Sequence, residues 1–298
     1  MKALHTPMPT TPPAPPRTDG RLTLHFALSP KTQQTTLRVV EQTPPLRVVR
    51  AFNQKNGAAM AHLHNVSGGV LGGDALTVTA MVGDGSRAQL TTPGATRVYR
   101  HRAGLADAQQ DNFFTVKGDG LLEYLPDPLI PFARSRYRQV TQIDLLDEAG
   151  LFWWEIVAPG RETIGEMFAY DCLDMAVDIT ANGRPIAIER LRIEPDSRPL
   201  NSLVRLGSYR YWSTFYICRA GQPESVWAAL EEELTALCRP THLGQETTWA
   251  VNTLPRDGLV VRGLGCTGRA LQSHLITLWQ AAKARLYQAP AVMPRKLY

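Results

Sequence analysis

The sequence predicts a mainly β protein that carries a small α+β element with two helices near its C-terminal end. Apolar and polar residues alternate in short runs from Leu22 to about Glu194, and no convincing helical period interrupts them. Turn signals rich in Gly, Asp and Asn recur through the same region roughly every 30 to 35 residues. Two helical patterns appear only after Pro223.

The chain divides into a tail and one folded domain. Residues 1–20 contain six prolines and four threonines and few residues to bury, which predicts a disordered tail. Residues 21–298 are expected to form a single domain. Within it we expect a β-stack over 21–220, a two-helix α+β element over 221–289 and a C-terminal tail over 290–298.

Strands are expected from the first residues of the domain. The segments 22–26, 37–39 and 46–48 all place apolar residues at every second position. In a strand, successive side chains point to opposite faces, so this spacing gives each segment one buried face.

A glycine-rich segment, 68–74, precedes a further predicted strand over 76–82. A phosphate-binding loop needs a helix opening directly behind it, and here a strand follows instead. We therefore expect the glycines to form a turn or a close approach between strands, with Asp74 capping the turn by accepting backbone N–H bonds. The glycines are Gly68, Gly69, Gly72 and Gly73.

The repeated turn signals lie at 83–85, 118–120, 147–150 and 181–183. Self-similarity at this period, with strands as the unit, is typical of strands stacked in coils, as in a β-helix. An ordinary β-sandwich is the alternative, and the spacing of the turns leaves both open.

Two helices and two strands are predicted at the end of the domain. The helices cover 224–238 and 267–288, and Thr267 is a suitable cap for the second. The strands cover 248–251 and 259–261. Together these segments form the α+β element.

Composition excludes several classes of protein. The net charge of +5 is spread along the chain without a basic run, which argues against binding to nucleic acid or to a membrane surface. No apolar stretch approaches the roughly 20 residues that span a bilayer, and the first residues do not resemble a signal peptide, so we expect a cytoplasmic location. The cysteines are too far apart for a zinc knuckle and are expected to be reduced. They are Cys172, Cys218, Cys238 and Cys266.

His62 and His64 are candidate metal ligands. In a strand, residues two apart point to the same face, and two imidazoles on one face suit nickel or zinc. The alternative is a pair of solvated or hydrogen-bonded histidines without a metal.

Charged residues interrupt two apolar strand segments. Glu155 lies within the run 151–157, and Glu189 and Arg190 follow the apolar residues 186–188. An unpaired buried carboxylate is expensive, so each must pair with a cation, stay protonated or face water in an interior channel. Neighbouring strand residues point to opposite faces, so Glu189 and Arg190 cannot pair directly. A surface position on an edge strand is the alternative.

Motifs of known enzymes are missing. The sequence contains neither His-Glu-x-x-His nor Gly-x-Ser-x-Gly, and no cysteine has a histidine at an activating distance along the chain. The pairs Gly160-Arg161 and Gly165-Glu166 are expected to shape a turn and to hold it with a charge pair.

Several sequence blocks together resemble the urease accessory protein D family, also called UreD or UreH. The resemblance runs from roughly residue 22 to the C-terminus, and it depends on the co-occurrence of the blocks in order and spacing. The blocks are 68–74, 90–96, 98–100, 122–126, 154–156, 160–161, 165–166, 184–186 and 189–190.

The resemblance implies a β-helix-like stack of strands and a non-catalytic scaffold or metallochaperone. Such a protein would bind urease accessory protein F, which recruits the GTPase accessory protein G, and would dock on apo-urease. In this family, acidic side chains at the positions of Asp74, Glu155 and Glu189, with Arg190, are thought to line an internal route for nickel. Nickel would be bound transiently, and no permanent cofactor is implied.

The C-terminal tail departs from the family pattern. Pro294 and Arg295 match a contact segment for a partner, but the expected aromatic residue behind them is missing unless Tyr298 replaces it. Two further functions stay open from the residues alone. One is a β-helix enzyme acting on polysaccharides, with Glu155 and Glu189 as acid and base. The other is a β-rich module that binds another protein.

Overall fold

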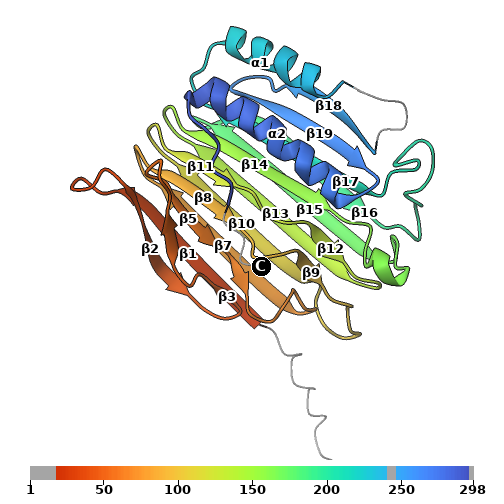
Figure 1. Cartoon of the computed structure of the whole chain (residues 1–298). Helices are drawn as coiled ribbons and strands as arrows, with labels where there is room; N and C mark the ends of the chain where they lie inside the picture. The colour runs from red at the N-terminus through yellow and green to blue at the C-terminus, as the bar shows by residue number, and fades with distance from the viewer. Residues whose placement is uncertain (1–17, 240–245, 295–298) are drawn as a thin grey trace, which may run out of the picture.

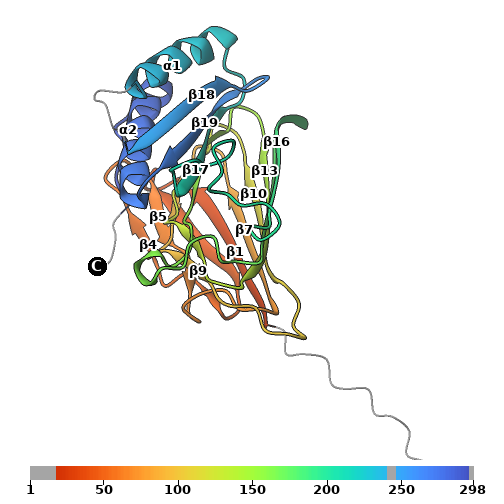
Figure 2. The same ribbon diagram turned by 90° about the vertical axis from the view of Figure 1, so that its right-hand side faces the viewer.

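The computed structural model describes residues 18–239 and 246–294, which form two large β-sheets and two helices in three layers (Figure 1). Sheet I has seven strands and sheet II has ten, and a two-stranded ribbon lies beside them. Figure 2 shows both helices on the same side of the molecule, with the strands of sheet I toward the opposite side. The mainly β fold class with two helices, predicted from the sequence, is confirmed.

Sheet I contains, in spatial order, β16 (Arg184–Ile193), β15 (Cys172–Ala181), β13 (Arg136–Leu145), β10 (Ala108–Val116), β7 (Asp74–Val82), β1 (Thr18–Leu28) and β2 (Thr35–Gln42). Sheet II contains, in spatial order, β18 (Thr247–Thr253), β19 (Gly258–Gly265), β17 (Tyr211–Arg219), β14 (Gly150–Val157), β11 (Leu121–Tyr124), β8 (Arg87–Thr91), β5 (Ala59–His62) and β4 (Ala51–Asn53). Off this path, β12 (Leu129–Pro131) pairs with β14 and with β9 (Thr96–Val98). The ribbon pairs β3 (Leu46–Arg47) with β6 (His64–Asn65).

The chain passes alternately through the two sheets. Each passage leaves sheet I, enters sheet II and returns to sheet I one strand further along, so β7, β10, β13 and β15 are mutually parallel neighbours. In sheet II the neighbours β5, β8, β11 and β14 are parallel for the same reason. Antiparallel strands close the ends of both sheets.

The recurring turn signals lie directly beside one another. The backbone N–H of Asp119 donates to Oδ1 of Asp84 at 3.0 Å, and that of Gly118 donates to Oδ2 of Asp147 at 3.2 Å. The N–H of Asp147 donates in turn to Oδ1 of Asn182 at 2.7 Å. The side chains of each turn thus satisfy backbone N–H groups of a neighbouring turn, which explains why the turn residues recur with every passage.

The glycine-rich segment lies against β9. Gly68 and Gly73 adopt φ values of +78° and +90°, a region that favours glycine. A Cβ at Gly69 would lie 2.5 Å from the carbonyl oxygen of Arg97, so the two backbones could not approach as they do with a larger residue. Gly72 also lies close to its surroundings, where a Cβ would be 3.3 Å from the His101 ring.

Two hydrophobic cores separate the layers. The first lies between the sheets and includes Leu24 and Phe114 from sheet I with Trp153 from sheet II. The second lies between sheet II and the helices α1 (Glu224–Leu237) and α2 (Gly268–Tyr287). The helix positions match the prediction, and the Thr267 hydroxyl caps α2 by accepting from Ala270 N–H at 3.2 Å.

Several expected boundaries differ. Strand β1 begins at Thr18, inside the predicted tail, and residues 1–17 of that tail lie outside the described residues. The strand expected over 46–48 is only the short β3. Val39 is 40% exposed because β2 is the edge strand of sheet I. In residues 18–239 and 246–294, no helix is long and apolar enough to cross a membrane.

Candidate functional site

A row of polar side chains crosses the first core. In sheet I, the register aligns Asn112, Thr141 and Glu189, with Val177 between the last two. In sheet II, the register aligns Glu155 with Thr214 and Arg262. The first core is otherwise mostly apolar, and the two buried members of the row, Asn112 and Thr141, are costly there unless they are hydrogen-bonded.

Glu155 projects from β14 into this interior. Gln139 on β13 donates a hydrogen bond to its carboxylate, and the Tyr137 hydroxyl donates to the Gln139 side-chain oxygen at 3.1 Å. Burial raises the pKa of Glu155 to about 7, with a smaller contribution from the nearby charge of Glu189. At neutral pH the carboxyl is therefore divided between its protonated and ionised forms.

Glu189 projects from β16 at the edge of sheet I. It accepts a hydrogen bond from the Tyr216 hydroxyl and forms an ion pair with Arg262, whose Nη2 lies 3.1 Å from its carboxylate. Tyr216 is held by stacking on Trp153, with the ring centroids 5.4 Å apart. Both partners of Glu189 come from sheet II, so this carboxylate bridges the two sheets.

Three hollows follow one another through the space between the sheets. An open cleft of about 390 Å³ lies where sheet II extends beyond β16, and Glu189 is part of its wall. A cavity of about 20 Å³ lies behind it and is lined by both Glu189 and Glu155. A second cavity, of about 40 Å³, begins at Glu155. We call the cleft the mouth and the two smaller spaces the inner cavities.

Two of the three predicted carboxylates, Glu189 and Glu155, thus stand at the junctions between these spaces. Glu189 separates the mouth from the first inner cavity, and Glu155 separates the first inner cavity from the second. A volume of 20 Å³ is about that needed for one water molecule. Met175 lines both inner cavities and adds a thioether to the oxygen groups.

Sequence reasoning missed the side-chain amides of the second inner cavity. Gln110 donates to Asn112 at 3.0 Å, and Asn112 donates to the Thr141 hydroxyl at 3.1 Å. With Gln139, they continue the polar row beyond Glu155. The signal was present in the sequence, because polar residues occupy alternate positions 110 and 112 of β10 and 139 and 141 of β13 where apolar residues are expected.

The other predicted residues, Arg190, Asp74, His62 and His64, do not line the hollows. Arg190 points to the outer face of sheet I, where it pairs with both oxygens of Asp178 at 2.8 and 2.9 Å. Its neighbour Glu189 points inward, as strand alternation requires. Asp74 lies at the start of β7 and accepts from Leu71 N–H at 2.9 Å, which is the turn cap expected for it. Burial raises the pKa of Asp74.

The two histidines do not share one strand. His62 ends β5 and is 2% exposed, whereas His64 belongs to β6, with Leu63 between the strands. Their ring centroids nevertheless lie 6.0 Å apart, and burial lowers the pKa of His64. Within the described parts of the chain, no group of three or more His, Cys, Asp or Glu side chains could hold a metal ion.

A fully buried ion pair lies on the other face of sheet II. Lys283 Nζ of α2 is 2.8 Å from both oxygens of Glu123 on β11, and Trp279 Nε1 donates to Oε1 at 2.8 Å. Burial raises the pKa of Glu123, and the contacts with Lys283 and Trp279 oppose that rise. The block 122–126 was recognised in the sequence, but the pairing with Lys283 joins residues 160 positions apart and has no local signal.

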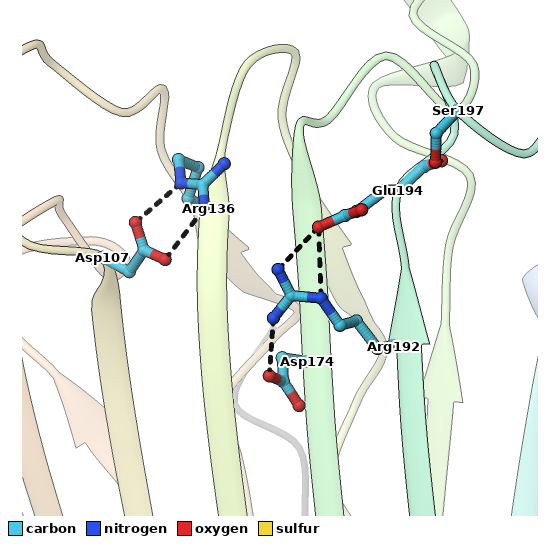
Figure 3. A network of polar contacts seen from close by, with 6 residues as sticks. All are labelled: Asp107, Arg136, Asp174, Arg192, Glu194 and Ser197. Atoms are coloured by element: carbon cyan, nitrogen blue, oxygen red, sulfur yellow. Dashed lines mark hydrogen bonds and ion pairs between the residues drawn. The ribbon is translucent and has the colours of Figure 1, made fainter.

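Charges on the outer face of sheet I pair with one another (Figure 3). Arg136 contacts Asp107 at 2.7 Å, and Arg192 contacts Asp174 at 3.1 Å and Glu194 at 2.6 Å. These pairs are well exposed, so each contributes little to stability.

The charge pair predicted between Arg161 and Glu166 is also present, with Arg161 Nε 2.8 Å from the carboxylate.

The remaining predicted features concern the cysteines and the C-terminus. All four cysteines lie in described segments and form no disulfide. Pro294 is buried, which leaves little of its side chain for a partner, and Arg295 lies outside the described residues.

Comparisons with known proteins agree on one family. The family model described as UreD urease accessory protein matches residues 18–297. A urease accessory protein UreD of Herpetosiphon aurantiacus is 46% identical over 283 residues, covering 95% of this chain and 97% of the relative. The UreD of Dechloromonas aromatica is 34% identical over 277 residues, covering 91% and 92% of the two chains. That of Alcanivorax borkumensis is 31% identical over 273 residues, with 91% and 88% covered.

Proposed function

Since this chain belongs to the family of UreD urease accessory proteins, we propose that it acts in urease maturation by passing nickel through the space between its two sheets. The relatives are named as accessory proteins, so the role is that of a chaperone and not of an enzyme. This sets aside the polysaccharide-cleaving alternative for Glu155 and Glu189.

The observation that carries the proposal is the position of the two carboxylates. Glu189 and Glu155 stand at the two junctions of the mouth and the inner cavities, so an ion moving inward meets them in turn. Carboxylate, amide and hydroxyl oxygens are ligands that a divalent ion accepts. Each junction offers one carboxylate and few other ligand atoms for a metal ion. This favours weak binding and onward movement of the ion over a closed metal site.

The partners follow from the family. We propose that accessory protein F binds this chain and brings the GTPase accessory protein G, and that the assembly docks on apo-urease. GTP hydrolysis then belongs to protein G, in agreement with the glycine-rich segment 68–74, which leads into β7 and not into a helix.

Urease activation in cells that express the accessory proteins and apo-urease tests the nickel step. Glu155→Gln and Glu189→Gln remove each negative charge with little change in volume, and we expect the double variant to lower both the nickel content and the activity of urease by about tenfold or more, since two ionic ligands are lost. Asp178→Asn is the matched control, because Asp178 pairs with Arg190 on the outer face of sheet I.

Assembly is measured in parallel. Co-purification of the variants with proteins F and G and with apo-urease should be unchanged, since neither carboxylate lies on the outer surface of a sheet. Normal nickel loading by the double variant contradicts the proposal. Loss of the assembly would instead show that the two carboxylates are structural.

A further inference from the structure

Arg262 is the only positive side chain for which the structure shows an ion pair with a junction carboxylate in the described residues. It lies on β19, in the row that contains Glu155 and Thr214, and its Nη2 reaches across to Glu189 Oε2 at 3.1 Å. Arg262 lines the mouth but neither inner cavity. Its guanidinium therefore meets Glu189 from the side at which an ion would enter.

The other arginines of the mouth are engaged elsewhere or lack such a contact. Arg192 is held by Asp174 and Glu194 on the outer face (Figure 3). Arg205 donates to the carbonyl oxygen of Pro199 at 3.1 Å. For Arg198, which also lines the mouth, the described residues show no ion pair.

The pair of Arg262 and Glu189 can open readily. The Arg262 side chain is 52% exposed and that of Glu189 is 28% exposed, so water screens their attraction. Exposed ion pairs of this kind contribute little to stability. The displaced guanidinium would turn into the mouth, where it remains hydrated. A divalent ion at Glu189 would carry two positive charges in place of the single charge of Arg262 and would be attracted more strongly.

We propose, on the basis of the nickel role above, that Arg262 is a tethered competitor for nickel at Glu189. Its guanidinium contacts Oε2 of Glu189, and an ion that binds this oxygen must displace it. The competition lowers the affinity of this junction. The same guanidinium returns when the ion moves toward Glu155, and this return favours onward movement over escape through the mouth.

Nickel binding to the full-length chain tests this inference, with Ni²⁺ as nickel chloride and equilibrium dialysis as the measurement. We expect Arg262→Gln to tighten Ni²⁺ binding about two- to fivefold, the gain that corresponds to removing a half-exposed competitor. Arg198→Gln removes the same charge from the same cleft without a contact to Glu189, and it should change the affinity less.

A double-variant comparison makes the test specific. In a Glu189→Gln background, Arg262→Gln should no longer tighten Ni²⁺ binding, because the competed carboxylate is gone. An unchanged affinity in Arg262→Gln overturns the inference. Equal tightening in Arg198→Gln, or tightening that persists in the Glu189→Gln background, overturns it too, since either result would show a general charge effect.

The outcome separates this inference from the proposed function. If Glu189→Gln weakens Ni²⁺ binding and Arg262→Gln has no effect, only the role of Arg262 is wrong. If neither Glu189→Gln nor Glu155→Gln changes Ni²⁺ binding, the proposed nickel route is wrong as well.

Discussion

The two faces of sheet II hold a buried and a partly buried carboxylate in different surroundings. On the face toward α2, Glu123 is 2% exposed and receives three contacts at 2.8 Å from Lys283 and Trp279. On the face toward sheet I, Glu155 receives one hydrogen bond from a neutral amide and borders both inner cavities. The strands that carry the two carboxylates, β11 and β14, are neighbours in the sheet.

The difference separates a structural from a functional role. A carboxylate that is neutralised by a lysine and sealed by packing has no capacity left for a further cation, and removing its partner leaves an uncompensated charge. A carboxylate beside a water-sized space, with a neutral partner, can accept a cation without breaking an existing ion pair. The contacts of Glu123 support a structural role in the attachment of α2, and the surroundings of Glu155 support the proposed cation binding.

The largest expected effect tests the structural side. Lys283→Met keeps the length of the side chain but leaves Glu123 as a buried charge without its cation, and it should lower the free energy of unfolding by about 3 to 5 kcal/mol. Chemical denaturation monitored by tryptophan fluorescence measures this. The double variant Glu123→Gln with Lys283→Met is the control and should recover most of the loss.

A small effect of Lys283→Met alone would show that the pair contributes no more than a surface contact. The distinction between the two faces would then lose its physical basis.

Local patterns predicted much of the fold but not the pairing across layers. The alternation in β1 and β7, the cap of α2 and the turn residues are local features, and each appears where the sequence indicates. The contact of Glu123 with Lys283 joins residues 160 positions apart, and no local pattern reports such a pair. Tertiary packing decides it.

The candidate site was predicted in part for the same reason. A charge inside an apolar strand identified Glu155 and Glu189, because burial of a charge is visible along one strand. Arg190 was wrongly placed in the interior, although alternation from Glu189 sends it to the outer face. Arg262 was not identified, since its partner lies 73 positions away on another sheet.

The second largest expected effect is the pH dependence of stability that Glu155 causes. The pKa of Glu155 is raised to about 7 in the folded chain, above the ordinary value of 4.5. Between these values the folded state holds a proton that the unfolded state has lost, so the contribution of Glu155 to stability falls as pH rises. Between pH 5 and pH 8, we expect the free energy of unfolding of the wild type to fall by on the order of 1 to 2 kcal/mol relative to that of Glu155→Gln, a value reduced for solvent screening near the cavities.

Denaturation of both proteins across this range measures the difference. Glu155→Gln is the appropriate reference because its amide oxygen can still accept the bond from Gln139. A difference that does not change with pH, or that changes in the opposite direction, would show that Glu155 is already neutralised by a partner in the way Glu123 is.

The smallest effect concerns a charge outside both cores. Arg190 is 56% exposed and pairs with Asp178 on the outer face of sheet I, so Arg190→Ala should change the free energy of unfolding by less than about 0.5 kcal/mol. Urease activation and Ni²⁺ binding should also stay at the wild-type level, since the side chain reaches neither the mouth nor the inner cavities. Arg190 and Arg262 both pair with a carboxylate of the β15–β16 edge, but only Arg262 does so from the inner side. A fall in urease activation with Arg190→Ala, at unchanged stability and assembly, would mean that the outer face of sheet I also takes part in nickel transfer. The role of a charge would then not be decided by whether it faces the inner cavities.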